Sequence, residues 1–305
     1  MSLFNFFVSK SIMHVPSPIV RYFAKDYVAG KSIDDAIRVS RELSSKGVET
    51  TLDILGEYIT RKEQAIPFKE ECIRILETIK REKLDANLSV KPTQMGILLD
   101  TEFAYDNMYE IVAKAAELDI FIRIDMENTP SLEPTLDFYR RLRNAFPDHV
   151  GVALQAYMRR SHDDIEALSD APMNFRLVKG IFIVNRQEAW KDLELVTRNY
   201  VELLDQMLSH GAYVGIATHD ERLYFEALKL IRKYDLKRDQ YEFQMLLGVD
   251  PELRDLIVSQ GHRLRVYLPY GEEWLGYSRR RLLENPNIAR AALGQILSGK
   301  GKEKE

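Results

Sequence analysis

Short β-favouring runs recur along this chain at roughly regular intervals, and amphipathic helical patterns separate them. The eight runs begin at Thr50, Ala86, Ile120, Val150, Phe175, Tyr213, Tyr241 and Arg263. Strands that alternate with helices indicate βαβ units and a parallel sheet. Eight such units are typical of a closed barrel, so the sequence predicts an α/β protein of the (β/α)8 TIM type.

Two further features favour a closed barrel over an open doubly wound sheet. No G-x-G-x-x-G motif follows the first run, as a dinucleotide-binding open sheet would require. Strands of an open parallel sheet are buried on both faces and read as continuously apolar. Several runs here carry a polar residue inside instead, and a barrel interior can accept it: Asp53, Ser89, Arg123, Arg176 and Glu242.

A helical pattern from Lys31 to Ser45 precedes the first run, with Ser32 in position to cap it. We therefore expect three parts: an N-terminal helical arm over residues 1–45, the barrel over 46–290, and the end of a C-terminal helix with a polar tail over 291–305.

Composition excludes several classes of protein. The formal net charge of −4 gives no reason to expect nucleic-acid binding. The single cysteine, Cys72, excludes an internal disulfide and a thiolate-rich metal site within one chain. No apolar run approaches the roughly 18 residues needed to span a bilayer. The aromatic stretch 1–10 lacks the basic start and cleavage site of a signal peptide.

Every predicted strand carries a polar or aromatic residue at or near its C-terminal end, the end of the barrel where such enzymes place their chemistry. These residues are Glu57, Lys91, Asp125, Gln155, Lys179, the run Thr218–Asp220, Gln244 and Tyr267. Each has a structural alternative; Asp125, for example, could cap the next helix. His219 and Asp220 are adjacent, but no second histidine cluster supports them, so we predict no metal site.

After the last strand, a short helical segment carries Trp274, Tyr277 and the run Arg279–Arg281. Aromatic faces beside guanidinium groups suit a small ligand with a flat apolar body and a carboxylate. The alternative is a solvated basic helix end. No G-x-S-x-G motif or catalytic cysteine signature is present, which argues against acyl transfer. A Schiff-base aldolase using Lys91 or Lys179 stays open.

The motifs S-V-K-P-T-Q, I-R-I-D-M-E, L-Q-A-Y, R-L-V-K-G, A-T-H-D, Y-E-F-Q-M-L and Y-S-R-R-R-L-L-E-N-P occur in this order over residues 31–286. In this respect the chain resembles bacterial monofunctional proline dehydrogenases. The resemblance implies a distorted (β/α)8 barrel, with a C-terminal helix over its mouth, that binds FAD noncovalently. It also implies oxidation of L-proline to Δ1-pyrroline-5-carboxylate and transfer of the electrons to a membrane quinone. We expect a cytoplasmic location, and leave open peripheral contact with the inner face of the cytoplasmic membrane.

The resemblance also implies roles for individual residues. The catalytic set is Lys91, Asp125, Arg176, Tyr267, Tyr277, Arg280 and Arg281. Of these, Lys91, Arg280 and Arg281 would bind the proline carboxylate, and Tyr267, Tyr277 and Leu246 would wall the ring. The residues that resemble FAD-contacting positions are Gln155, Arg176, Val178, Lys179, Gly180, Thr218, His219 and Gln244. Glu57 and Arg281 would form an ion pair that gates the site, and Glu57 and Asp125 are the expected counter-charges.

One departure from the family pattern follows Gly180, where this chain has the bulky Ile181 in I-F-I-V-N-R. Because Ile181 lies close to the expected cofactor, it bears on FAD binding. One alternative beside the aldolase is therefore a ligand-binding barrel that has lost catalysis. Another alternative is a flavin barrel acting on a different substrate.

Overall fold

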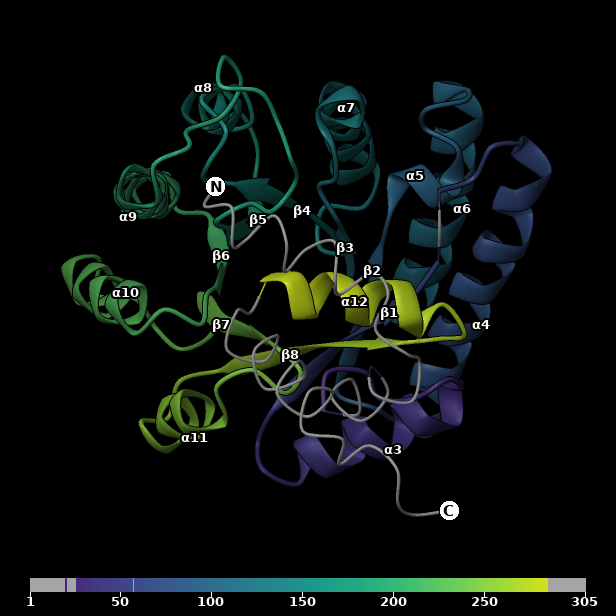
Figure 1. Cartoon of the computed structure of the whole chain (residues 1–305), viewed down its shortest axis with the longest axis horizontal. Coiled ribbons are helices and arrows are strands. Elements are labelled where there is room, and N and C mark those ends of the chain that lie inside the picture. Colours follow the sequence, from purple (N-terminus) through teal and green to yellow (C-terminus); the bar gives the residue numbers. More distant parts are fainter. Residues whose placement is uncertain (1–19, 21–25, 57, 285–305) are drawn as a thin grey trace, which may run out of the picture.

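The computed structural model describes residues 20, 26–56 and 58–284, and for residues 280–284 the helical backbone only. Eight parallel strands close into a barrel in sequence order (Figure 1). They are β1 (Glu49–Ile54), β2 (Ala86–Val90), β3 (Ile122–Ile124), β4 (Val150–Gln155), β5 (Asn174–Val178), β6 (Tyr213–Ala217), β7 (Tyr241–Leu246) and β8 (Leu264–Tyr270). The predicted (β/α)8 architecture is confirmed.

Most strands differ from the predicted runs by one or two residues at an end, and β3 and β8 show why. β3 is short, because the preceding helix ends at Asp119 in a left-handed conformation (φ 56°) and the Ile120 amide still bonds back to that helix. β8 continues past Tyr267 to Tyr270, because it pairs with β1 as far as Ile54. The end of the preceding helix therefore sets the start of β3, and pairing with β1 sets the end of β8.

Helices surround the barrel, and the last of them covers its mouth (Figure 1). Their bounds are α3 (Ile33–Ser44), α4 (Ala65–Glu82) with the preceding 3-10 turn η1 (Lys62–Gln64), α5 (Pro92–Met95), α6 (Thr101–Leu118), α7 (Thr129–Ala145), α8 (Ser161–Glu166), α9 (Leu193–Ser209), α10 (Glu221–Lys233), α11 (Pro251–Ser259) and α12 (Trp274–Glu284).

The distortion of the barrel concerns its first and last helices. In a regular barrel the helix after β8 completes the outer ring. Here α12 lies across the barrel mouth, as expected, and α3 packs on β1 and β8 in the ring position that α12 leaves (Figure 1). Ser32 caps α3 in a reciprocal capping box with Asp35, so the predicted helix forms where its sequence places it. The predicted divisions at residues 45, 46 and 291 stay predictions.

The barrel interior is polar. The guanidinium of Arg176 on β5 contacts Ser89 on β2 and Gln244 on β7, which it can do only across the inside of the barrel. Side chains alternate along each strand, so the apolar residues between these polar ones face the helices. Leu88, Ile122 and Leu177, for example, are fully buried in the apolar core.

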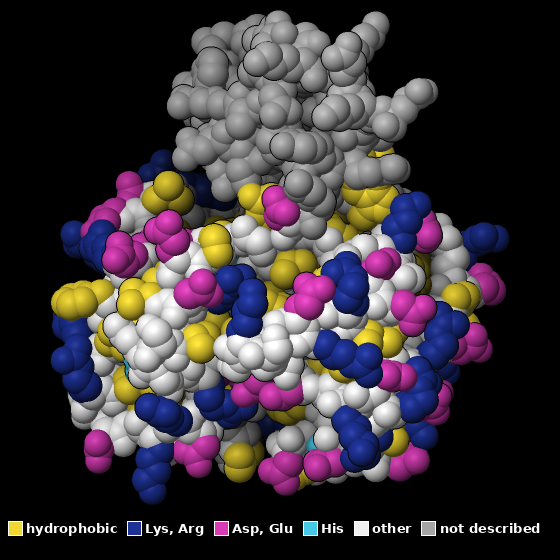
Figure 2. Space-filling view, turned by 90° about the horizontal axis from the view of Figure 1, so that it is seen from below, with side chains coloured by type: hydrophobic (Ala, Val, Ile, Leu, Met, Phe, Trp, Pro, Cys, Tyr) yellow, Lys and Arg dark blue, Asp and Glu magenta, His cyan; other side chains and the backbone are white. Residues whose placement is uncertain are grey.

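The outer surface has no broad region of one charge on the face that Figure 2 shows, where acidic and basic side chains are interspersed. Within residues 26–56 and 58–284, none of the helices combines the length and apolar character needed to cross a bilayer.

Candidate active site

Lys91 stands at the end of β2, inside the barrel mouth, between two carboxylates. Its ammonium group donates a hydrogen bond to Asp53 on β1 and lies 3.7 Å from Asp125, just after β3. Burial alone would lower the pKa of Lys91, but Asp53 and Asp125 outweigh it and raise the pKa to about 12. Lys91 is therefore a fixed cation at neutral pH.

Asp125 connects Lys91 to Arg176 on β5. One carboxylate oxygen accepts from Arg176 Nη1 and from Ser89 Oγ, both at 2.7 Å. The other accepts from the Tyr267 hydroxyl at 2.8 Å. Burial would raise the pKa of Asp125, but Arg176 and Lys91 outweigh it and lower the pKa, so this carboxylate stays ionised.

Tyr267 completes the cluster from β8. Its hydroxyl also accepts a hydrogen bond from Lys91 Nζ at 3.3 Å, and Arg176 lies over its ring, 5.2 Å from the centroid. Burial and the charges of Asp125 and Asp53 hold the pKa of Tyr267 well above its usual value. Tyr267 is therefore a neutral donor with a rigidly held aromatic face.

A chain of buried hydrogen bonds, here called the relay, holds Arg176 in place; it runs through Gln244 and Glu242 to Arg265. Its Nε donates to Gln244 Oε1 at 2.6 Å, and Gln244 Nε2 donates to Glu242 Oε1 at 2.5 Å. Glu242 accepts two further bonds from Arg265 Nε, at 2.9 and 3.1 Å. This relay fixes which end of the Gln244 amide faces Arg176. Among the residues the structure covers, none bonds Arg176 Nη2, so that end can serve a ligand.

The predicted cofactor residues lie along β4 to β7. Gln155 is buried and its amide donates to the carbonyls of Met126 and Glu127. Gln155 pairs with Val178 in the strand register. Lys179 forms an ion pair with Asp220 at 2.7 Å, with roughly a third of each side chain exposed. Gln155 and Lys179 therefore lie on the side of the mouth formed by β4 to β7.

Two backbone features shape the same edge. Gly180 has φ +104°, and a Cβ there would overlap the ring of Tyr157. His219 Nε2 accepts the Leu246 amide proton at 2.7 Å, which places the proton of a neutral ring on Nδ1. Thr218 is buried and accepts the Asp220 amide proton. Ile181, which departs from the family pattern, is 47% exposed.

The predicted substrate residues of α12 are only partly observed. Tyr277 is buried in a small cluster with Val28 and Leu55, so it also packs α12 onto the barrel. The side chains of Arg280 and Arg281 lie outside the described part of the structure, as does Glu57. The predicted gate between Glu57 and Arg281 therefore stays a prediction.

Sequence reasoning missed Asp53 as a member of the site. It named Glu57 and Asp125 as counter-charges. Asp53 and Asp125 contact Lys91, and Glu57 lies outside the described residues, so its role stays a prediction. Asp53 is a polar residue between two apolar neighbours in a strand, and that pattern was the signal in the sequence that could have identified it as a site residue. Glu127 was also missed; its carboxylate accepts from the amide and hydroxyl of Thr93, two residues after Lys91.

Comparison with known proteins gives the arrangement its context. The family model described as proline dehydrogenase matches residues 36–292. The chain belongs to the proline dehydrogenase family. It is 36% identical to proline dehydrogenase 2 of Bacillus subtilis (strain 168) over 275 residues, 90% of each chain. It is 35% identical to the proline dehydrogenase of Deinococcus radiodurans over 280 residues, again 90% of each. Membership of this family implies a flavin cofactor.

A solved structure supports the fold. Proline utilization A from Bdellovibrio bacteriovorus, inactivated by N-propargylglycine, superposes with a TM-score of 0.81 at 23% identity. The match covers 92% of this chain but 34% of that protein. The barrel is therefore shared, while the larger protein contains much that this chain does not match.

Proposed function

We propose that this chain oxidises L-proline to Δ1-pyrroline-5-carboxylate in proline catabolism, with FAD as its flavin. The observation that carries the proposal is the ammonium of Lys91, held between Asp53 and Asp125 beside Arg176 at the barrel mouth. A partly buried cation with fixed geometry suits a substrate carboxylate. Lys91, Arg280 and Arg281 would converge on that carboxylate. The two acidic partners of Lys91 supply the counter-charge that these three cations need when no substrate is bound.

The proposed substrate position follows from this cluster. Lys91 would bind the proline carboxylate together with Arg280 and Arg281 of α12. Tyr267 would present its ring to the pyrrolidine, with Leu246 and Tyr277 as the other apolar walls. Asp125 positions both Lys91 and Tyr267, since it contacts both groups.

The residues of β4 to β7 fit a flavin dinucleotide. Its ring carbonyls and nitrogens would accept hydrogen bonds, and Arg176 Nη2 is an available donor, held in place through Gln244, while buried Gln155 would contribute packing at the same edge. Lys179 at the same edge suits the pyrophosphate. Val178, Gly180, Thr218 and His219 complete the proposed cofactor set. When bound, the flavin supplies the hydride acceptor.

The protonation states favour positioning and electrostatics over acid–base catalysis. The pKa of Tyr267 is raised, so its hydroxyl does not accept a proton, and Asp125 is a weak base because its pKa is lowered. We infer that proline reacts as the neutral amine, with its proton already lost to solvent. The chain then contributes a fixed orientation and the cation Arg176 near the flavin.

The charge of Lys91 argues against the aldolase alternative. A Schiff base requires a neutral lysine amine, which active sites obtain by lowering the pKa. Here the pKa of Lys91 is raised to about 12 instead. Lys179 is engaged by Asp220.

We propose a membrane quinone as the electron acceptor, reached by peripheral contact of a cytoplasmic enzyme. Two exposed apolar side chains near the cofactor edge fit such a contact: Ile183 after β5, 101% exposed, and Leu193 at the start of α9, 81% exposed. Pelleting with anionic lipid vesicles tests this. The contact is rejected if Ile183→Asp and the wild type sediment equally.

A visible absorption spectrum tests the main proposal. The purified protein should show flavin bands that bleach on addition of L-proline and return with a soluble quinone, and the released cofactor should chromatograph as FAD. Lys91→Met serves as the control: it should keep the bands but need far more proline. Absence of flavin would refute the cofactor, and bands that proline leaves unchanged would refute the substrate.

A further inference from the structure

Gly215 on β6 lies between two charged side chains that project into the barrel from the neighbouring strands. In the strand register, Gly215 stands opposite Arg176 on β5 and opposite Glu242 on β7. Side chains at paired positions point to the same side of a sheet. This level of the barrel interior therefore carries a cation, a position without a side chain, and a carboxylate on three strands in turn.

The amide of Gln244 occupies the space that a side chain on Gly215 would fill. Gln244 lies two residues after Glu242 on β7, so both side chains face the interior. A Cβ on Gly215 would lie 2.4 Å from Gln244 Nε2 and 2.8 Å from its Cδ, far closer than a van der Waals contact. Glycine is therefore required for this amide to reach from β7 to Arg176 on β5.

Glu242 determines which way the Gln244 amide points. The pKa of Glu242 is lowered to about 2, so at neutral pH its carboxylate is ionised and only accepts hydrogen bonds. The amide nitrogen must face Glu242, and the amide oxygen is left for Arg176 Nε. The reverse orientation would set two donors against each other at Arg176 and two acceptors against each other at Glu242.

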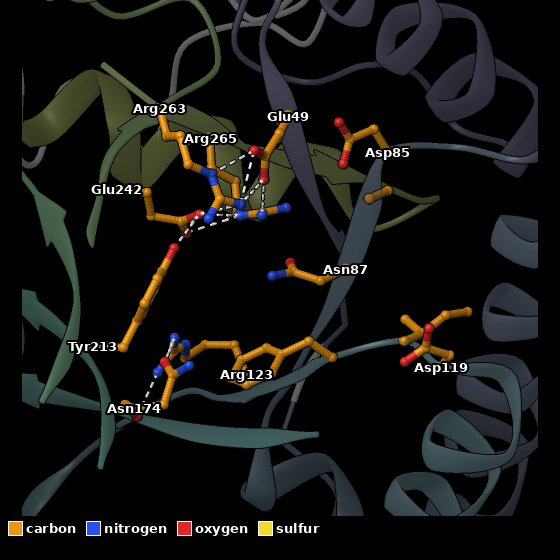
Figure 3. A pocket seen from close by; sticks show the side chains of 13 residues that line it. Glu49, Asp85, Asn87, Asp119, Arg123, Asn174, Tyr213, Glu242, Arg263 and Arg265 are labelled. Atoms are coloured by element: carbon orange, nitrogen blue, oxygen red, sulfur yellow. Dashed lines mark hydrogen bonds and ion pairs between the residues drawn. The ribbon is translucent and has the colours of Figure 1, made fainter. Parts of the chain in front are cut away.

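Glu242 is itself held from a pocket at the opposite end of the barrel, where the strands begin (Figure 3). On one side of this pocket, Figure 3 shows Tyr213 and Arg265 bound to Glu242. Arg265 also pairs with Glu49, and Glu49 pairs with Arg263, so the two carboxylates and two guanidinium groups are together neutral. The lower end of the relay is therefore fixed and balanced in charge without any contribution from Arg176.

We propose that the relay, seated on Gly215, positions Arg176 for the flavin. Gly215, Gln244 and Glu242 are then positioning residues, none of which needs to touch the cofactor. Asp125 holds Arg176 Nη1 and Gln244 holds Nε, which leaves Nη2 to donate to the flavin. A guanidinium fixed in one orientation beside the flavin stabilises the reduced, anionic form. The role assigned to these residues rests on the proposed function, because it needs a flavin beside Arg176.

Gly215→Ala tests this role without removing a charge. Glu242→Gln would also disturb the relay, but it is expected to destabilise the protein as well. The methyl group of Gly215→Ala displaces only the far end of the flexible Gln244 side chain, so the barrel can still fold. In the flavin-loaded full chain, we expect a more negative flavin midpoint potential than in wild type. The kcat for proline should fall roughly ten- to hundredfold, with a smaller change in KM.

Two control variants separate positioning from a general effect on β6. Ile216→Val removes a methyl group from the helix-facing side of the same strand, where Ile216 is fully buried, and should leave the potential and kcat unchanged. Gln244→Ala alone should make the potential more negative. In the Gln244→Ala background, the methyl group of Gly215→Ala meets no amide, so the double variant should have the potential of Gln244→Ala.

The Arg176 Nε–H signal provides a readout that does not depend on flavin reduction. In NMR of arginine-labelled protein, with Arg176→Lys to assign the signal, it should shift in Gly215→Ala and not in Ile216→Val. A wild type that holds no flavin, or a flavin that proline does not reduce, would refute the proposed function. The positioning role is overturned if Gly215→Ala leaves the potential or the Arg176 signal as in wild type, or if Gln244→Ala leaves the potential unchanged.

Discussion

Glu242 offers a sharp test of how the polar barrel interior is held together. It is 2% exposed and accepts hydrogen bonds from Gln244, from Tyr213 at 3.0 Å, and from Arg265. Burial would raise its pKa, but the charge and hydrogen bonds of Arg265 outweigh it and lower the pKa from 4.5 to about 2. We predict that Glu242→Gln destabilises the protein strongly at neutral pH.

The magnitude follows from the shift. Each pKa unit corresponds to roughly 1.4 kcal/mol, so the ionised Glu242 contributes about 3 kcal/mol at pH 7. A pKa lowered by folding gives stability that is complete above the unfolded pKa and lost as pH falls through the folded one. The difference between wild type and Glu242→Gln should therefore shrink from about 3 kcal/mol to near zero between pH 4.5 and 2.

Urea unfolding at a series of pH values measures this difference. Glu49→Gln is the matched control, because Glu49 also pairs with Arg265 but burial raises its pKa. A carboxyl group whose pKa is raised by folding contributes stability that falls as pH rises. The stability that Glu49→Gln loses relative to wild type should therefore not increase between pH 2 and 4.5. A constant difference between Glu242→Gln and wild type over the whole range would refute the reasoning.

Three further predictions concern the proposed active site. Asp53→Asn removes the partner that orients Lys91, and should raise KM for proline roughly ten- to hundredfold with less effect on kcat; steady-state kinetics with an unchanged KM would contradict it. Arg280→Ala or Arg281→Ala should cost roughly 2 to 4 kcal/mol in kcat/KM through loss of carboxylate binding, with flavin content near normal by absorbance. Tyr277→Ser should reduce the preference for proline over trans-4-hydroxyproline, expected at roughly one to two orders of magnitude. An unaltered ratio of the two kcat/KM values would mean that Tyr277 only packs α12 onto the barrel.

The helices and strands of this fold can be predicted from short stretches of the sequence. Period-two and helical patterns, together with caps such as Ser32, define the strands and helices without reference to distant residues. The count of eight strands and the polar residues within them were enough to predict the closed barrel. The order of motifs was enough to place the chain in its family.

Tertiary structure decided which of these residues meet. Both faces of a barrel strand are buried, so burial alone does not tell an inward side chain from an outward one. The stagger between strands brings Asp53, a residue inside β1, to Lys91. It also aligns Glu242, Gln244 and Arg176 in one relay.

The same reason explains how the first and last helices are placed. Local pattern gives α3 and α12 as helices, but only the closed barrel determines that α3 fills the outer ring while α12 lies across the mouth.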